Sequence, residues 1–252
     1  MALAAAIVVT ASKVAERADP FLAAMMVTVP ISAGPAYVFL ALEHGARFVE
    51  ASTLVSLCAN AATGVFTAVY ALLARRRGLL LSLALALAAW FATVLALIER
   101  PWTMSEGFLL NVATFAAAIL ATRHLARESK PRQAPVRRWW DIPFRAALVG
   151  VLVCIVLLSG RWFGSTVAGM FAFLPIVLIS MALILHPRMG GEAAGEVLRK
   201  AIPGMFGVAG AISVLHASVV PLGPALALSL ALATSLAWNA GLILTRMRRQ
   251  RA

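Results

Sequence analysis

Charged residues are scarce in this chain. Of its 252 residues, 13% are charged and 62% are hydrophobic, whereas a typical soluble domain is about a quarter charged and about half apolar. The mean hydropathy is +0.92. Packing in water cannot hide this much apolar surface, which excludes a soluble globular protein and predicts a polytopic membrane protein. Apolar runs fill nearly the whole chain, so we expect no separate soluble domain.

Cysteine is almost absent, and carboxylates are missing from the middle of the apolar runs. Cys58 and Cys154 lie in apolar segments without the spacing of metal ligands, which predicts packing residues. All ten Asp and Glu residues fall near the ends of the apolar runs or between them. A proton-coupled cation exporter is expected to carry a carboxylate inside the membrane. Its absence favours a neutral, amphipathic or anionic solute.

Enzyme signatures are missing as well. No nucleophile–base arrangement is evident, and "GSTVAG" at Gly164–Gly169 lacks the lysine and the spacing of a phosphate-binding loop. The sequence therefore predicts a protein that is not an enzyme and that needs no cofactor or metal.

The apolar runs predict an all-α fold of about nine transmembrane helices, because only helices satisfy every backbone group within one continuous segment in lipid. The expected spans are residues 2–16, 20–42, 51–74, 78–98, 104–122, 144–161, 164–186, 201–218 and 224–245.

The basic residues predict an orientation for these spans. If the N-terminus is outside, 19 of the 22 Lys and Arg residues lie inside, and only Arg47, Arg100 and Arg161 lie outside. This bias favours an N-outside, C-inside protein of a bacterial inner membrane. It also accounts for the net charge of +12 without a nucleic-acid partner.

Two stretches of the chain match at a nearly constant offset. "PISAGPAYVFLALEHG" (30–45) and "PIVLISMALILHPRMG" (175–190) share Pro, Ile and the final Gly at an offset of 145. "LSLALA" occurs at 81–86 and at 228–233, and a tryptophan follows each copy, at Trp90 and Trp238. We therefore expect a four-helix repeat at 1–100, a linker helix and basic loop at 101–143, and a second repeat at 144–252. Because a single linker span separates the two copies, the second copy has the opposite orientation in the membrane. Such inverted repeats are common in secondary transporters.

The second unit resembles the GlpM-like family of small four-helix bacterial membrane proteins. The resemblance rests on "AGMFAFLPI" (168–176), "GMFG" (204–207) and "ALATSLAW" (231–238), and the first unit keeps "AAMMVTVPI" (23–31). It implies a four-span unit and names no substrate. The plan of two opposed four-helix units is also similar to the drug/metabolite transporter superfamily, an analogy of architecture alone.

Two features mark a candidate site. Pro30 and Pro175 lie midway along equivalent spans, where they favour either ordinary kinks or paired bends that line a central site. Ser56, Asn60 and Thr63 share one helix face, as a cavity wall or as helix–helix hydrogen bonds. The candidate substrate-binding residues are Pro30, Ser32, Gly34, Asn60, Thr63, Pro175 and Ser180.

These features favour a carrier or exporter of a small metabolite that works by alternating access. A flippase or other lipid-handling protein is the alternative, and a structural or assembly subunit of a membrane complex is a third class. The expected partners are membrane lipids and the unidentified solute, and a homodimer is compatible with the sequence.

Overall fold

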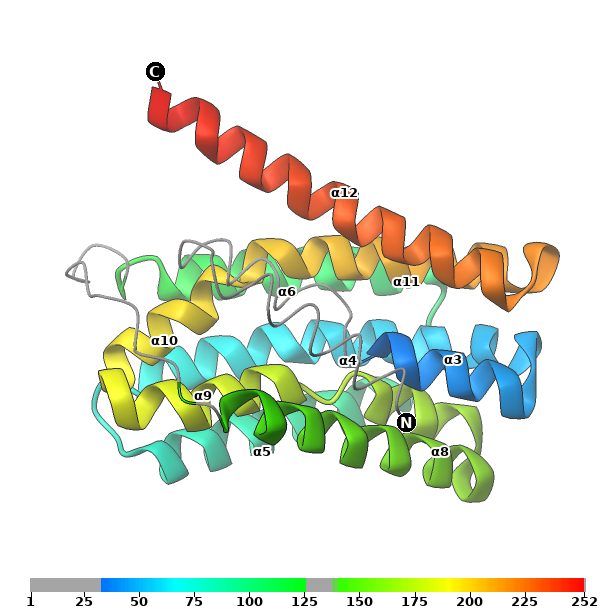
Figure 1. Ribbon diagram of the computed structural model, residues 1–252, viewed down its shortest axis with the longest axis horizontal. Coiled ribbons are helices and arrows are strands. Elements are labelled where there is room, and N and C mark those ends of the chain that lie inside the picture. Colours follow the sequence, from blue (N-terminus) through cyan, green and yellow to red (C-terminus); the bar gives the residue numbers. More distant parts are fainter. Residues whose placement is uncertain (1–32, 126–137, 139, 252) are drawn as a thin grey trace.

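The computed structural model describes residues 33–125, 138 and 140–251. Within these ranges the chain forms helices and no strand (Figure 1). In chain order the helices are α3 (Ala33–His44), α4 (Ala46–Leu73), α5 (Leu79–Ile98), α6 (Met104–Thr122), α8 (Asp141–Ala172), α9 (Ile176–Met189), α10 (Gly191–Lys200), α11 (Ile202–Leu222) and α12 (Pro224–Arg251). The predicted all-helical fold is confirmed.

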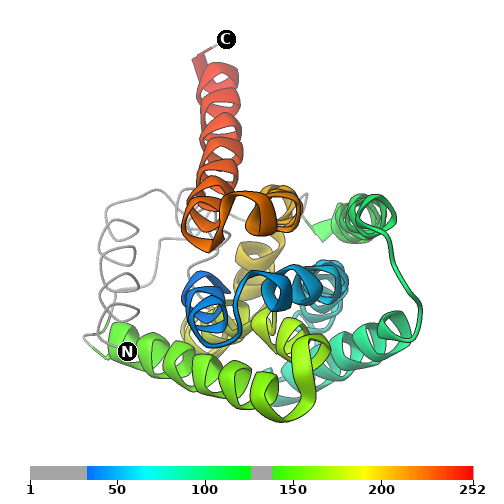
Figure 2. The ribbon, with the colours of Figure 1, turned by 90° about the vertical axis from the view of Figure 1, so that its right-hand side faces the viewer.

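Helix α4 forms the centre of the bundle. It packs against α3, α5, α6, α8, α10 and α11, and most of its length is buried (Figure 2). The surrounding helices α5, α6 and α12 bury only one face each. Their outer faces carry Leu80, Leu109 and Leu226, which are 79%, 65% and 60% exposed. Large apolar side chains over whole helix faces are suited to lipid, as expected of a membrane protein.

Six described helical stretches are long and apolar enough to cross a membrane. Predicted spans 78–98 and 104–122 correspond closely to α5 and α6. The predicted first span, and the second up to residue 32, lie outside the described residues. The count of nine spans and the inverted repeat therefore stay predictions.

One predicted span is wrong in its continuity. Residues 164–186 were expected to form a single helix, but α8 ends at Ala172 and α9 begins at Ile176. The N-terminal part of α8, up to Phe163, covers the predicted span 144–161. Gly164 then turns the chain back at φ 79° and ψ −171°.

Glycines with positive φ join antiparallel helices at both ends of the bundle. Gly45 (φ 82°) connects α3 to α4, and Gly190 (φ 83°) connects α9 to α10 at the opposite end (Figure 1). Each glycine donates its N–H to the carbonyl four residues back, at 3.0 Å in both turns. Each also accepts from the amide four residues ahead, at 3.3 Å for Gly45 and 3.1 Å for Gly190. A side chain would strain this backbone conformation.

Helix α9, with 14 residues, is too short to cross a membrane. It begins near the middle of the molecule and runs to one end, whereas the described part of α3 runs to the opposite end (Figure 1). Helix α3 also packs against α12, while α9 packs against α5. The two helices thus have matching positions relative to the predicted repeats.

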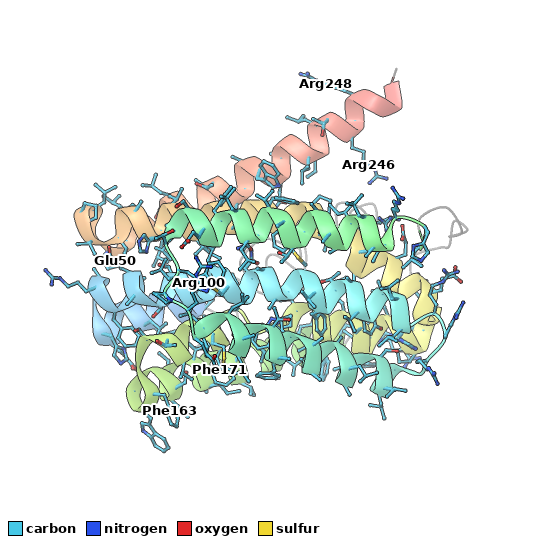
Figure 3. All side chains as sticks on the ribbon, turned by 180° about the vertical axis from the view of Figure 1, so that it is seen from behind. Glu50, Arg100, Phe163, Phe171, Arg246 and Arg248 are labelled. Atoms are coloured by element: carbon cyan, nitrogen blue, oxygen red, sulfur yellow. The ribbon has the colours of Figure 1, made fainter. Side chains whose placement is uncertain are left out.

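Four charged residues mark the two ends of the bundle. Arg100 and Glu50 lie at one end of the bundle, and Arg246 and Arg248 lie toward the other (Figure 3). The side of the membrane to which each end belongs stays a prediction.

Candidate functional site at the centre of the bundle

The α8–α9 break lies where the described cores meet. Phe173, in the break, packs against each of the three clusters of buried apolar side chains. Its ring also contacts Tyr37 of α3, with centroids 6.4 Å apart. The break therefore brings the start of α9 close to Tyr37 of α3.

The break has a clear cause and a local hydrogen-bond pattern. Pro175 lacks an N–H and adopts φ −74° and ψ 50°, outside the helical region. The amides of Phe173 and Leu174 turn to the carbonyls three residues back, at 3.3 and 3.0 Å. Helical bonding resumes when the Ile179 amide donates to the Pro175 carbonyl at 2.9 Å. The bend predicted at Pro175 is confirmed, as a full interruption of the helix.

The break frees the Gly169 carbonyl, because the Phe173 amide that would bind it turns to Met170 instead. The Ser56 hydroxyl of α4 donates to this carbonyl at 2.8 Å. Ser56 has no second proton, so Tyr37 donates its own hydroxyl to Ser56 Oγ at 2.6 Å. A freed backbone carbonyl in lipid needs such a donor. The Tyr37–Ser56–Gly169 chain therefore holds the interrupted helix against α3 and α4.

Asn60 lies one turn beyond Ser56 and is 3% exposed. Its Nδ2 donates to Asn111 Oδ1 of α6 at 2.9 Å and to the Met205 carbonyl of α11 at 3.4 Å. The Asn111 amide in turn donates to the backbone carbonyls of Leu57 and Gly107, at 2.9 and 2.8 Å. Asn60 thus ties three helices together through bonds that are all internal to the protein.

Thr63 faces a different helix. Its hydroxyl donates to the Ala59 carbonyl at 3.0 Å and accepts from the Trp90 indole of α5 at 3.3 Å. The Trp90 Nε1–H also reaches the Ala59 carbonyl at 3.2 Å. The polar side chains of α4 therefore form hydrogen bonds with several neighbouring helices, as expected for helix–helix packing in membranes.

The remaining predicted site residues are scattered. Pro30 and Ser32 lie outside the described residues. Gly34 lies in the described part of α3 and is partly exposed. Ser180 is 2% exposed and donates to the Val177 carbonyl of its own helix at 2.7 Å. Of the predicted set, the structure gives Asn60 and Thr63 contacts between helices and places Pro175 at the break.

Tyr37 was missed, although the sequence carries a signal for it. The chain has only two tyrosines, both within apolar segments, and a buried tyrosine hydroxyl usually finds a partner. The second one, Tyr70, bonds His186 Nδ1 of α9 at 2.9 Å. Near the other end of α4, Thr53 Oγ1 bonds His216 Nδ1 of α11 at 2.8 Å.

The centre of the bundle holds no fixed charge among the described side chains. The buried polar set consists of hydroxyls and amides, and its single charged member, Asp141, lies at the start of α8. The described residues contain no group of three or more His, Cys, Asp or Glu side chains able to hold a metal ion. This centre can donate and accept hydrogen bonds but offers no counter-charge.

Comparisons with protein-family models, curated proteins and solved structures found no match to this chain. The resemblance to GlpM-like proteins therefore stays a prediction. The features of the structure that bear on function are the α8–α9 break and the polar contacts that α4 makes around it.

Proposed function

We propose that this chain is an inner-membrane carrier or exporter built from two inverted four-helix repeats around the α8–α9 break. The observation that carries the proposal is the α8–α9 break, at which α9 begins near the middle of the molecule (Figure 1). Helix α9 runs from the break to Gly190 at one end, and the described part of α3 runs in the opposite direction to Gly45, 145 residues earlier in the chain. A discontinuous helix near the midplane is typical of inverted-repeat transporters.

Contacts at the predicted equivalent positions support the repeat. The Trp90 indole of α5 donates to the Ala59 carbonyl of α4. The Trp238 indole of α12 donates to the Pro203 carbonyl, at the start of α11, at 2.8 Å. The two tryptophans are 148 residues apart and their two acceptors are 144 apart. Each proposed repeat therefore has an indole-to-backbone contact at a similar position, although the offsets differ by a few residues from 145.

Asn60 supports a two-fold relation between the repeats. Its carbonyl partner on α11, Met205, is 145 residues further along the chain, which equals the offset of the sequence match. Two equivalent residues that touch must lie beside the axis that relates them. Asn60 therefore marks the proposed pseudo-two-fold axis, where a solute site is expected in this class of protein.

The substrate class follows from the charge of this region. The described centre offers hydroxyls and amides without a carboxylate, and no side chain caps the first turn of α9. A cation would lose its hydration without gaining a counter-charge. We therefore infer a small neutral, amphipathic or anionic metabolite as the solute.

The test is solute flux in liposomes that contain the purified full-length chain. The lumen is loaded in turn with labelled neutral, amphipathic and anionic metabolites, and with a cation as the expected negative. Once a solute moves, Asn60→Ala and Pro175→Ala should slow its exchange. Ser229→Ala is the matched control, because Ser229 is exposed on α12 and bonds only its own helix. Unchanged flux in the Asn60, Pro175 and Pro30 variants would contradict the proposed site.

The same liposomes separate the other two classes. Faster movement of a labelled lipid between leaflets, without solute flux, would identify a flippase. If neither solute flux nor lipid movement is detected, and a fixed protein partner co-purifies from the membrane, the chain is a structural or assembly subunit.

A further inference from the structure

Two bidentate ion pairs tie α3 and α9 to opposite ends of one membrane-spanning segment. Arg161 of α8 donates to both oxygens of Glu43 on α3, at 3.0 and 2.8 Å. Arg188 of α9 donates to both oxygens of Asp141, at the start of α8, at 2.7 and 2.6 Å. Asp141 and Arg161 are 20 residues apart in α8, about 30 Å of helix, which matches the hydrocarbon thickness of a bilayer.

The two pairs occupy equivalent positions on α3 and α9. Glu43 and Arg188 are 145 residues apart, the offset of the sequence match, and each lies two residues before a turn glycine. Glu43 is acidic and Arg188 is basic, so each of these helices needs a partner of the opposite charge on α8. The N-terminal part of α8 supplies an acid at one end and a base at the other. Each helix is therefore held at its C-terminal end, next to the glycine at which the chain turns.

The two fastenings differ in burial. In the α3 pair, Arg161 is 58% and Glu43 is 27% exposed. In the α9 pair, Arg188 is 13% and Asp141 is 9% exposed. Water competes for the exposed pair, whereas breaking the buried pair leaves two charges without compensation.

Further contacts strengthen the α9 pair. The Arg188 guanidinium lies over the Trp140 ring, 5.0 Å from its centroid, and the Arg138 backbone N–H donates to Asp141 at 3.1 Å. The helix dipole also favours the α9 pair over the α3 pair. Arg188 is favourably placed in the last turn of α9, while Glu43 is an acid near the C-terminus of α3.

We propose that these ion pairs are the latches of two gates at opposite faces of the membrane, and that the α9 latch is locked while the α3 latch opens first. Helices α3 and α9 are the moving parts, and Gly45 and Gly190 are their hinges. The N-terminal part of α8 stays in place and carries one residue of each ion pair. The gating role rests on the proposed transport function, whereas the difference in latch strength does not.

The test is hydrogen–deuterium exchange, read by mass spectrometry, of the full-length chain in lipid nanodiscs. In the unmodified protein, residues 38–44 of α3 should exchange faster than residues 183–189 of α9. Arg188→Gln should speed exchange of 183–189 by at least about tenfold. Glu43→Gln should speed exchange of 38–44 by less than about threefold. Arg100→Gln is the control, because its 2.6 Å pair with Glu106 joins α6 only to its own preceding loop.

A milder variant covers the case in which Arg188→Gln fails to fold. Arg188→Lys keeps the charge but loses the two-pronged contact and the stacking on Trp140. It should speed exchange of 183–189 by a smaller factor and leave 38–44 unchanged. Equal exchange of the two segments in the unmodified protein, or a larger effect from Glu43→Gln than from the Arg188 variants, would overturn the latch assignment.

The experiments can overturn the latch assignment and the transport proposal independently of each other. The predicted exchange pattern without solute flux would overturn the proposed function and leave the unequal latches in place. Solute flux with equal exchange of both segments would overturn the latch inference alone.

Discussion

Replacing Ser56 by alanine should destabilise the protein more than replacing its partner Tyr37 by phenylalanine. Ser56→Ala leaves two buried groups without partners, the Gly169 carbonyl and the Tyr37 hydroxyl. An unsatisfied buried polar group costs about 1–3 kcal/mol, while side-chain bonds within membrane proteins average about 0.6 kcal/mol. We therefore expect a loss of about 2–3 kcal/mol in the free energy of unfolding.

Tyr37→Phe is the milder change because Ser56 still donates to the Gly169 carbonyl. It removes one neutral hydrogen bond, which is worth about 0.5–1.5 kcal/mol. The double variant should cost no more than Ser56→Ala alone, since the hydroxyl left unpaired by Ser56→Ala is then absent. The double-mutant cycle should thus show a coupling of about 0.5–1.5 kcal/mol.

The assay is reversible unfolding in mixed micelles with rising denaturing detergent, followed by far-UV circular dichroism. Ser229→Ala is the matched control and should change stability by less than about 0.5 kcal/mol, because Ser229 is exposed and bonds its own helix. Equal losses for Ser56→Ala and Tyr37→Phe, or additive losses in the double variant, would refute the hydrogen-bond chain as the support of the break.

Two further predictions concern close packing and acid stability. Gly169→Ala should prevent folding or reduce the thermal midpoint strongly, because its Cβ would overlap the Ser52 carbonyl of α4, whereas Gly241→Ala, with open space around it, should be nearly neutral or stabilising. Acid should selectively weaken the α8–α9 contact. Burial raises the pKa of the Asp141 carboxyl, but hydrogen bonds from Arg188 and the Arg138 amide outweigh this and lower the pKa below its ordinary value of 3.8. A lowered pKa contributes stability above pH about 4 that is lost as the pH falls through the folded-state pKa. Unfolding measured from pH 6 to pH 2 should show this loss, and Asp141→Asn should flatten it; an unchanged slope in that variant would contradict the assignment.

The sequence predicted the helices well because the length and composition of an apolar run are local properties. Residues 78–98 and 104–122 were placed almost to the residue, and the bend at Pro175 follows from a missing N–H. Whether such a proline only kinks a helix or interrupts it depends on a donor for the freed carbonyl. That donor is Ser56, which lies 113 residues earlier in the chain. No local pattern contains this information.

The polar stripe on α4 shows a second limit. The spacing of Ser56, Asn60 and Thr63 placed them roughly on one side of a helix, and they were candidates for one cavity wall. In the structure they bond α8 and α3, α6 and α11, and α5 respectively. A central helix with neighbours on all sides converts one polar face into contacts with many partners. The sequence alone could not distinguish this arrangement from a cavity lining.

The two proposed repeats differ in the continuity of one helix. Helix α4 is continuous for 28 residues, whereas the matching stretch of the second repeat has a turn at Ala201, between α10 and α11. At the proposed offset, the counterpart of Ala201 is Ser56, the residue that supports the α8–α9 break. The second repeat thus has a break at Pro175 and a turn at Ala201, and α4 of the first repeat, which is unbroken, bonds the break. If the repeats exchange conformations during transport, the bond from Ser56 to Gly169 is among those that must break. The cost of breaking it, measured by the cycle above, is then part of the barrier to the conformational change.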